Sequence, residues 1–315
     1  MGWAFAPGLL GRRKREANMK AAANAKTSAR AVQGVFAPGP EHWVGDGFYV
    51  KTVFWPQLDA QMLSPFLLLD HAARRRFDAS PYRRGVGEHP HRGFETVTFA
   101  YEGEVEHRDS AGGGGRIGPG DVQWMTAASG VVHEEKHSRS FSERGGDFEM
   151  VQLWVNLPAS KKMSEPRYQP LLDREFPRLQ LGAAEGRLVA GSLAGKTGPA
   201  QTHTPITTFD LRFHEDGTSE VELPVGWTTL VFPLEGDLTA GPDRELIGSR
   251  HFGVFDRDDD GAVQLHANKG ARVLVLAGQP LDEPVVAYGP FVMNTREEIG
   301  QAFADYQSGR MGRLR

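Results

Sequence analysis

The sequence contains no cysteine among its 315 residues. This absence excludes disulfide scaffolds, cysteine-ligated zinc modules, iron–sulfur proteins and enzymes with a cysteine nucleophile. The chain also lacks any apolar run near the roughly 20 residues that a membrane helix needs, so we expect no membrane association. A net charge of −4 gives no general attraction to nucleic acid. What the sequence does contain is 11 histidines, 38 glycines and 20 prolines.

Charge of one sign gathers only at the N-terminus. Seven of the first 30 residues are Lys or Arg, against the single acid Glu16. The apolar residues precede this basic run and are interrupted by Pro7 and Gly8, which does not fit a secretory signal. A short basic run on a flexible end is more often solvated than bound to nucleic acid. We therefore predict a flexible basic extension over residues 1–35, no direct nucleic-acid binding, and a cytoplasmic location, or a nuclear one in a eukaryote.

After residue 34 the sequence changes to short apolar runs separated by glycine and proline, which is typical of strands joined by tight turns. Strands are expected at residues 48–55, 94–101, 122–125, 148–157, 226–234, 251–255 and 272–277. One helix is expected at the C-terminus, where Thr295 and Glu298 form a capping-box pair ahead of Ile299, Phe303 and Tyr306. The body of the chain is therefore predicted to be mostly β.

Two segments of the chain repeat each other. Residues 93–105 align without gaps on residues 226–238 and share Gly, Thr, Phe, Glu and Gly in register. A repeat at this spacing in strand-rich sequence predicts two similar β-domains in tandem rather than a solenoid of short units. The prolines at 158, 166 and 170 indicate a linker. We therefore expect domains at 36–165 and 166–290, with a helix and tail at 291–315.

Histidines gather on two predicted strands of the first copy. His89 and His91 share one face of a strand by alternation, and about 42 residues later His133 and Glu135 share a face of another, with His137 two residues further. One His-x-His pair is a weak signal. Both sets together are strong, because a β-barrel core would otherwise bury four polar groups without partners. Such nitrogen and oxygen ligands suit iron(II), manganese, nickel, copper or zinc, so the residues predict a metal site.

The corresponding positions of the second copy carry other residue types. Carrying the alignment back from Gly226 places Glu222 and Pro224 opposite His89 and His91. Aligning residues 130–133 on residues 261–264 places Gln264 and His266 opposite His133 and Glu135. These residues cannot build the same site. We therefore expect a second domain without metal, whose cavity is at most empty or differently lined.

The pattern Gly-x-x-x-His-x-His-x-x-x-Glu, followed by Pro-Gly-Asp and then by Gly-x-x-His, resembles the two motifs of cupins, which are small jelly-roll barrels with a metal inside. Longer runs are similar to the pirin family of bicupins. They cover residues 89–97, 119–127, 152–157 and 289–295. The resemblance extends from about residue 36 to about residue 310. It implies an all-β fold of two tandem cupin barrels with a C-terminal α-helix.

The resemblance also implies one Fe(II) per chain in the N-terminal barrel. The implied ligands are His89, His91, His133 and Glu135. In the wider cupin pattern the carboxylate ligand occupies the position of Glu95 instead, so we expect Glu95 to orient a ligand imidazole or Arg92. His137 and His107 are further candidates for supporting the ligands.

The activity implied by the resemblance is a flavonol 2,3-dioxygenase that uses O2, with quercetin as the type substrate. Glu135 is the expected base for the proton of the 3-hydroxyl group. The aromatic residues Phe94, Trp124 and Phe54 either line the cavity or pack in the core. An alternative of another class is a non-enzymatic co-regulator whose iron changes redox state and thereby a protein-contacting surface. A third is a partner of a central-metabolism enzyme. The fold and the site alone do not choose among these functions.

Overall fold

The computed structural model describes residues 29–55 and 61–314. Most of the predicted basic extension, including the basic run at 12–15, therefore lies outside the described residues. Within the described residues, no helix is long and apolar enough to cross a membrane.

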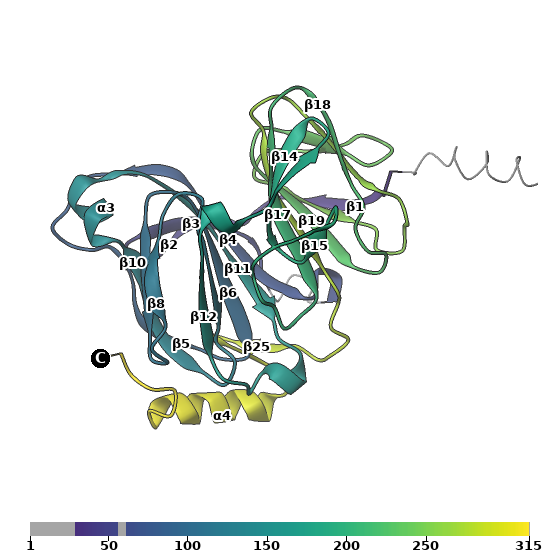
Figure 1. Cartoon of the computed structure of the whole chain (residues 1–315). Coiled ribbons are helices and arrows are strands. Elements are labelled where there is room, and N and C mark those ends of the chain that lie inside the picture. Colours follow the sequence, from purple (N-terminus) through teal and green to yellow (C-terminus); the bar gives the residue numbers. More distant parts are fainter. Residues whose placement is uncertain (1–28, 56–60, 315) are drawn as a thin grey trace, which may run out of the picture.

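The first barrel consists of a large and a small antiparallel sheet that face each other (Figure 1). The large sheet, in spatial order, contains β12 (Arg167–Leu171), β9 (Val122–Thr126), β6 (Phe94–Glu102), β11 (Gly146–Asn156), β4 (Phe66–Phe77), β3 (Phe48–Phe54) and β2 (Glu41–Val44). The small sheet contains β5 (Gly85–His91), β10 (Val131–His137), β7 (Val105–Asp109) and β8 (Gly114–Ile117). The short helix α3 (Arg139–Arg144) follows β10.

The second barrel repeats this arrangement strand for strand. Its large sheet contains β1 (Val32–Phe36), β22 (Phe252–Phe255), β19 (Thr228–Glu235), β24 (Arg272–Gly278), β17 (Ile206–Phe213), β14 (Ala184–Ala190) and β13 (Arg178–Leu181). Its small sheet contains β18 (Gly217–Val221), β23 (Val263–Ala267), β20 (Leu238–Ala240) and β21 (Glu245–Ile247). The predicted tandem of two β-barrels is therefore confirmed, and the seven predicted strands all form.

The edge strands do not follow the order of the chain. β1 precedes the first barrel in sequence but pairs with β22 of the second, with Val35 opposite Gly253. β12 contains Pro170 of the expected linker but pairs with β9 of the first barrel, with Gln169 opposite Trp124. The borders expected at residues 35 and 165 therefore differ from the borders of the sheets, because strand pairing rather than chain order assigns an edge strand to its barrel.

The outward faces of the two large sheets pack against each other and form one apolar core between the barrels. Members of this core from both barrels include Val97, Phe99, Val151, Leu230, Phe232 and Leu274. Phe54 and Trp124 also lie in this core, fully buried, so they pack between the barrels. The molecule is thus a stack of four sheets, and the inner face of the first large sheet remains available for polar side chains.

The interior of the second barrel is filled with apolar side chains. Its core contains Leu188, Phe209, Leu211, Val231, Val273 and Val275. The strand pairing also corrects the sequence alignment of this barrel. Val105 lies opposite His137, and Leu238, which aligns with Val105, lies opposite Ala267. Ala267 therefore occupies the position of His137. Val263 and Leu265, both buried, therefore occupy the positions of His133 and Glu135, in place of the expected Gln264 and His266. The loops between the strands differ in length, so the alignment of residues 130–133 on 261–264 is one residue out of register.

The chain returns to the first barrel after the second is complete. The hairpin of β25 (Val286–Tyr288) and β26 (Phe291–Met293) leads into α4 (Arg296–Gln307), which lies below the first barrel in Figure 1. The expected capping box forms, since Thr295 and Glu298 cap each other's backbone N–H groups. Arg92 on the first barrel donates to Asp305 of α4 at 2.8 Å, and both side chains are largely buried. The C-terminal segment is therefore attached next to the strand that carries His89 and His91.

Candidate metal centre

Three imidazoles meet inside the first barrel because β5 and β10 are neighbours in the small sheet. Their register places His133 opposite His89 and Val131 opposite His91. The ring centroids lie 4.2 Å apart for His89 and His133, and 4.9 Å apart for each of the other two pairs. One ring nitrogen from each histidine lies within 4.8 Å of the others, a spacing that suits a shared metal ion.

The hydrogen bonds of these histidines leave one nitrogen of each ring facing the site. His89 Nδ1 lies 2.7 Å from the carbonyl oxygen of Gly87, and His91 Nδ1 lies 3.3 Å from that of Pro290. A carbonyl only accepts, so both Nδ1 atoms carry the proton and both Nε2 atoms keep a lone pair. Within the described residues His133 Nε2 is buried without a hydrogen-bond partner. A buried orphan nitrogen beside two others is the arrangement that a metal ion would satisfy.

The charge state of the rings also suits metal binding. Burial, reinforced by the neighbouring His89, lowers the pKa of His91 to about 3. Burial, together with the neighbouring His89, His91 and His107, lowers the pKa of His133 well below its ordinary value. Both rings are therefore neutral at physiological pH, and neutral imidazole is the form that binds metal ions.

Glu135 approaches the same interior from β10 and is held by the opposite sheet. Its Oε1 accepts hydrogen bonds from Gln123 Nε2 and from Thr98 Oγ1, the latter at 3.3 Å. Its Oε2 accepts one from Gln152 Nε2 at 2.8 Å. The carboxylate, His133 and His107 form a second potential metal-binding group, in which one ligand atom of each residue lies within 4.8 Å of the others. Three of the four expected ligands thus lie in one triad, and Glu135 lies in a second triad that shares only His133 with the first.

Glu95 is not part of either group. Gly93, with φ of +89°, turns the chain between β5 in the small sheet and β6 in the large sheet, and this turn interrupts the alternation of side chains. Thr98 faces Glu135, so Glu95 projects from the other face of β6, toward the core between the barrels. There its Oε1 accepts a hydrogen bond from Thr126 Oγ1 at 2.6 Å. Burial raises the pKa of this carboxyl group to about 7.

The other two supporting candidates occupy different surroundings. His107 is buried, and its Nδ1 lies 3.3 Å from Nδ1 of His133. The ring of His137 lies among four phenylalanine rings, and its Nε2 is 3.0 Å from the carbonyl oxygen of Gly47. These four are Phe48, Phe77, Phe141 and Phe148. His107 therefore contacts an expected ligand, whereas His137 belongs to the apolar end of the barrel.

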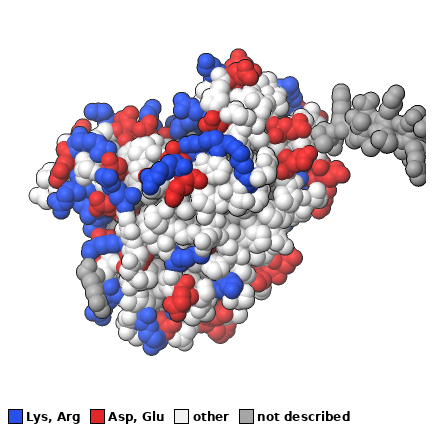
Figure 2. Space-filling view, in the orientation of Figure 1, with Lys and Arg blue, Asp and Glu red and all other residues white. Residues whose placement is uncertain are grey.

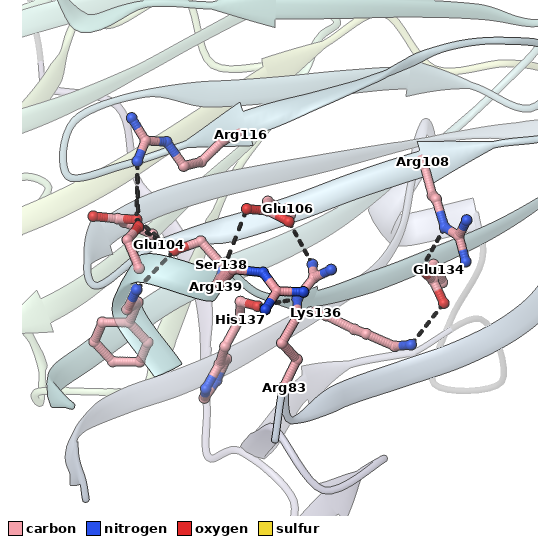
Figure 3. Close-up of polar contacts among 12 residues, drawn as sticks. Arg83, Glu104, Glu106, Arg108, Arg116, Glu134, Lys136, His137, Ser138 and Arg139 are labelled. Carbon is pink, nitrogen blue, oxygen red and sulfur yellow. Dashed lines mark hydrogen bonds and ion pairs between the residues drawn. The ribbon is translucent and has the colours of Figure 1, made fainter. Parts of the chain in front are cut away.

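The outward face of β10 carries Val132, which packs against the C-terminal segment, and two charged residues that form ion pairs. Glu134 lies between Arg108 and Lys136, and Glu106 pairs with Arg83 (Figure 3). On the face of the molecule shown in Figure 2, basic and acidic side chains are likewise interspersed. Alternation thus places Glu134 and Lys136 on the outer face of β10 and His133 and Glu135 on its inner face.

The surroundings of His91 and His89 differ in exposure. The rings of Phe94 and Trp154 lie 5.0 Å and 5.2 Å from that of His91 and form an apolar wall. Phe94 therefore borders the site. His133, His91 and Glu135 are buried, whereas His89 is partly exposed, so access from solvent is on the side of His89.

Several polar residues of the site were not identified from the sequence. They are Thr98, Asp109, Gln123 and Gln152, together with the carbonyl group of Pro290. Gln123 and Gln152 carry a recognisable signal, since each is a polar residue with an apolar residue two positions away on its strand, Met125 for Gln123 and Met150 and Trp154 for Gln152. The contribution of Pro290 has no such signal, because any residue offers a carbonyl.

Comparison with known proteins agrees with this architecture. The family model for pirin matches residues 48–155, and that for the pirin C-terminal cupin domain matches residues 208–312. A Pseudomonas aeruginosa protein named "Putative quercetin 2,3-dioxygenase" is 52% identical over 89% of this chain and 98% of its own length. Human pirin is 37% identical over 79% of this chain and 83% of its own.

A crystal structure of quercetin 2,3-dioxygenase from Acinetobacter baumannii superposes with a TM-score of 0.88. It is 44% identical to this chain and the match covers 91% of this chain and all of that one. Family models, relatives and solved structure thus agree along both barrels. The chain belongs to the pirin family.

Proposed function

We propose that this chain is a pirin-type flavonol 2,3-dioxygenase that uses one Fe(II) in its first barrel together with O2. The observation that carries the proposal is the group of three histidines whose Nε2 atoms are free to bind a metal, with Glu135 beside His133. The quercetin 2,3-dioxygenase names of the Pseudomonas and Acinetobacter relatives support the choice of a flavonol as substrate.

Iron fits the residues present. The site offers nitrogen and oxygen donors and no thiolate, which suits a metal of intermediate hardness. Three neutral imidazoles and one carboxylate would leave a net charge of +1 on Fe(II), and in an octahedron two positions would stay open. Iron(II), when bound, supplies Lewis acidity and one-electron chemistry with O2.

The side chains of this protein then have separate roles. Glu135 would receive the proton of the flavonol 3-hydroxyl group on a carboxylate oxygen, which converts the substrate to an electron-rich anion. Gln123 and Gln152 hold that carboxylate by donating to it. The hydroxyl of Tyr168 donates to Gln123 Oε1 at 3.3 Å and thereby directs the amide NH2 of Gln123 toward Glu135. Phe94 and Trp154 would keep water from the site.

The test is consumption of quercetin by protein reconstituted with Fe(II) without oxygen. After air is admitted, the flavonol absorbance should fall in proportion to the protein. The His91→Ala variant should lose this turnover by more than about 100-fold, since it removes an iron ligand. His214→Ala, an exposed histidine of the second barrel, is the matched control and should turn over as the unmodified protein does. Absence of turnover in unmodified protein with iron demonstrably bound would contradict the proposal.

A further inference from the structure

We infer that Asp109 and His107 form a hydrogen-bond relay that fixes the tautomer and orientation of His133, and that both are positioning residues of the metal centre. The inference rests on the proposed metal site and goes beyond it, because neither residue is one of the four proposed ligands. The relay acts on His133, which belongs to both triads of potential ligands. A wrongly oriented His133 ring would therefore affect the whole site.

The relay runs along one row of side chains. Asp109 Oδ2 lies 3.1 Å from Nε2 of His107, and Nδ1 of His107 lies 3.3 Å from Nδ1 of His133. The side chains of Asp109 and His107 are almost completely buried, so water does not compete for these contacts. The three residues come from the adjacent strands β7 and β10, whose register places Asp109 opposite His133 and His107 opposite Glu135.

The donors and acceptors of this row can be matched in only one way when Nε2 of His133 faces a metal. The proton of His133 then lies on Nδ1, and the atom next to it, Nδ1 of His107, must accept it. His107 therefore carries its own proton on Nε2, where the carboxylate of Asp109 accepts it. The result is a carboxylate–imidazole support of the kind that fixes the tautomer of metal-binding histidines in proteins.

The carboxylate at the end of the relay is itself immobilised. Its other oxygen, Oδ1, accepts hydrogen bonds from the backbone N–H of Ala111 at 2.9 Å and of Gly113 at 2.8 Å. Burial would raise the pKa of Asp109, but the hydrogen bonds from His107, Gly113 and Ala111 outweigh it and lower the pKa. A Cβ atom at Gly113 would lie 2.4 Å from Asp109 Oδ2 and 2.6 Å from Cβ of Tyr168. Only glycine at 113 thus permits this close packing.

Tyr168 connects the relay to the second ligand of β10. Its ring stacks on His107 with centroids 4.7 Å apart and planes 8° apart. Its hydroxyl group donates to Gln123, which in turn donates to Glu135. One aromatic residue from β12 therefore supports both arms, one ending at His133 and the other at Glu135.

The second barrel provides an internal comparison. The gap-free repeat continues from Val105 and Leu238, so Ala240 occupies the position of His107. The positions of His133 and Glu135 there are Val263 and Leu265. The barrel fold thus forms with alanine in place of His107, and histidine occurs only in the copy that also has the metal ligands. This distribution favours a role at the site over a role in folding.

The test compares metal affinity in four variants. Asp109→Asn keeps the acceptor for Gly113 but offers an NH2 group to His107, which reverses the relay. His107→Leu and His107→Asn have nearly the same shape, but the Asn oxygen can stand near the position of Nδ1 and accept from His133. Glu106→Gln removes an acid from the outward face of the same strand, where it pairs with Arg83, and serves as the control (Figure 3).

We expect Asp109→Asn and His107→Leu to weaken anaerobic Fe(II) binding by about 10- to 100-fold, with partial recovery in His107→Asn and no change in Glu106→Gln. The second readout is the tautomer of His133 in the metal-free protein, measured by ¹⁵N NMR of the imidazole nitrogens. It should be the Nδ1–H form in the unmodified protein and shift toward Nε2–H in Asp109→Asn. A loss of fold would not produce this exchange between two ring nitrogens.

Three results would overturn the inference. One is unchanged affinity and an unchanged His133 tautomer in Asp109→Asn. Another is equal affinity of His107→Leu and His107→Asn, which would assign only packing to His107. The third is a fall from two bound ions to one in His107→Leu, which would make His107 a ligand of a second ion. If the unmodified protein binds no metal, the proposed function fails, while the NMR readout still decides the relay.

Discussion

Replacing Glu135 by alanine is expected to lower the affinity for Fe(II) by more than about 100-fold, because loss of a group that merely supports a ligand already costs roughly 10- to 100-fold. The carboxylate would supply the negative charge among otherwise neutral ligands. Its removal also takes away the carboxylate acceptor that the amide groups of Gln123 and Gln152 share, and leaves Thr98 Oγ1 as their remaining acceptor in a buried site. Iron content per chain after reconstitution and gel filtration measures this effect.

Glu134→Ala is the matched control for that experiment. Glu134 is adjacent in sequence but points to the outer face of β10, where Arg108 and Lys136 surround it (Figure 3). It should retain iron at the level of the unmodified protein. If Glu135→Ala keeps its iron and Glu95→Ala loses it, the carboxylate ligand is Glu95, as in the general cupin pattern, and Glu135 is not a ligand.

Replacing Glu95 by glutamine is expected to stabilise the protein at neutral and alkaline pH. The carboxyl group is fully buried between the barrels, and burial raises its pKa to about 7 from an ordinary value near 4.5. Between these two pH values the folded chain holds a proton that the unfolded chain releases, so the free energy of unfolding falls as the pH rises. The shift corresponds to about 3 kcal/mol above pH 7, as an order of magnitude.

Glutamine is neutral at every pH and can still accept the hydrogen bond of Thr126. Chemical denaturation should therefore show Glu95→Gln more stable than the unmodified protein by about 2–3 kcal/mol at pH 8 and equal to it at pH 4. Glu102→Gln, at the partly exposed end of the same strand, where the carboxylate pairs with Arg74, should change stability by less than about 1 kcal/mol at both pH values. Loss of iron from Glu95→Gln, or a loss of stability at pH 8, would contradict its placement in the core.

Much of the architecture could be predicted because the relevant signals are local. Alternation marks the strands, and the repeat of residues 93–105 at 226–238 marks the two barrels. The pairs His89 with His91 and His133 with Glu135 follow from the two-residue period of a strand. Their meeting does not follow from it, since it depends on the pairing of β5 with β10. The family resemblance supplied that step.

Where the sequence interpretation failed, a break in local regularity was responsible. Strict alternation would put Glu95 on the face of His91, but the turn at Gly93 moves the chain from one sheet to the other and reverses the face. A Cβ at Gly93 would lie 1.9 Å from the carbonyl oxygen of Val292, so the close approach of the C-terminal segment requires glycine there. The one-residue error that placed Gln264 and His266 in the positions of His133 and Glu135 arises from a loop whose length differs between the two copies.

Long-range support of the ligands was the least predictable feature. His91 donates to the carbonyl of Pro290, nearly 200 residues away in the chain. Arg92, next to it, is anchored by Asp305 of α4. These contacts depend on the return of the C-terminal segment to the first barrel, for which neither composition nor periodicity gives a signal. They make the first barrel's site dependent on residues that follow the second barrel.

The most direct test of the central claim is anomalous diffraction at the iron absorption edge from crystals of freshly purified protein. One strong peak per chain is expected, at bonding distance from the Nε2 atoms of His89, His91 and His133 and from the carboxylate of Glu135. A peak beside Glu95, a peak inside the second barrel, or a fully occupied site without iron in catalytically active crystals would contradict it.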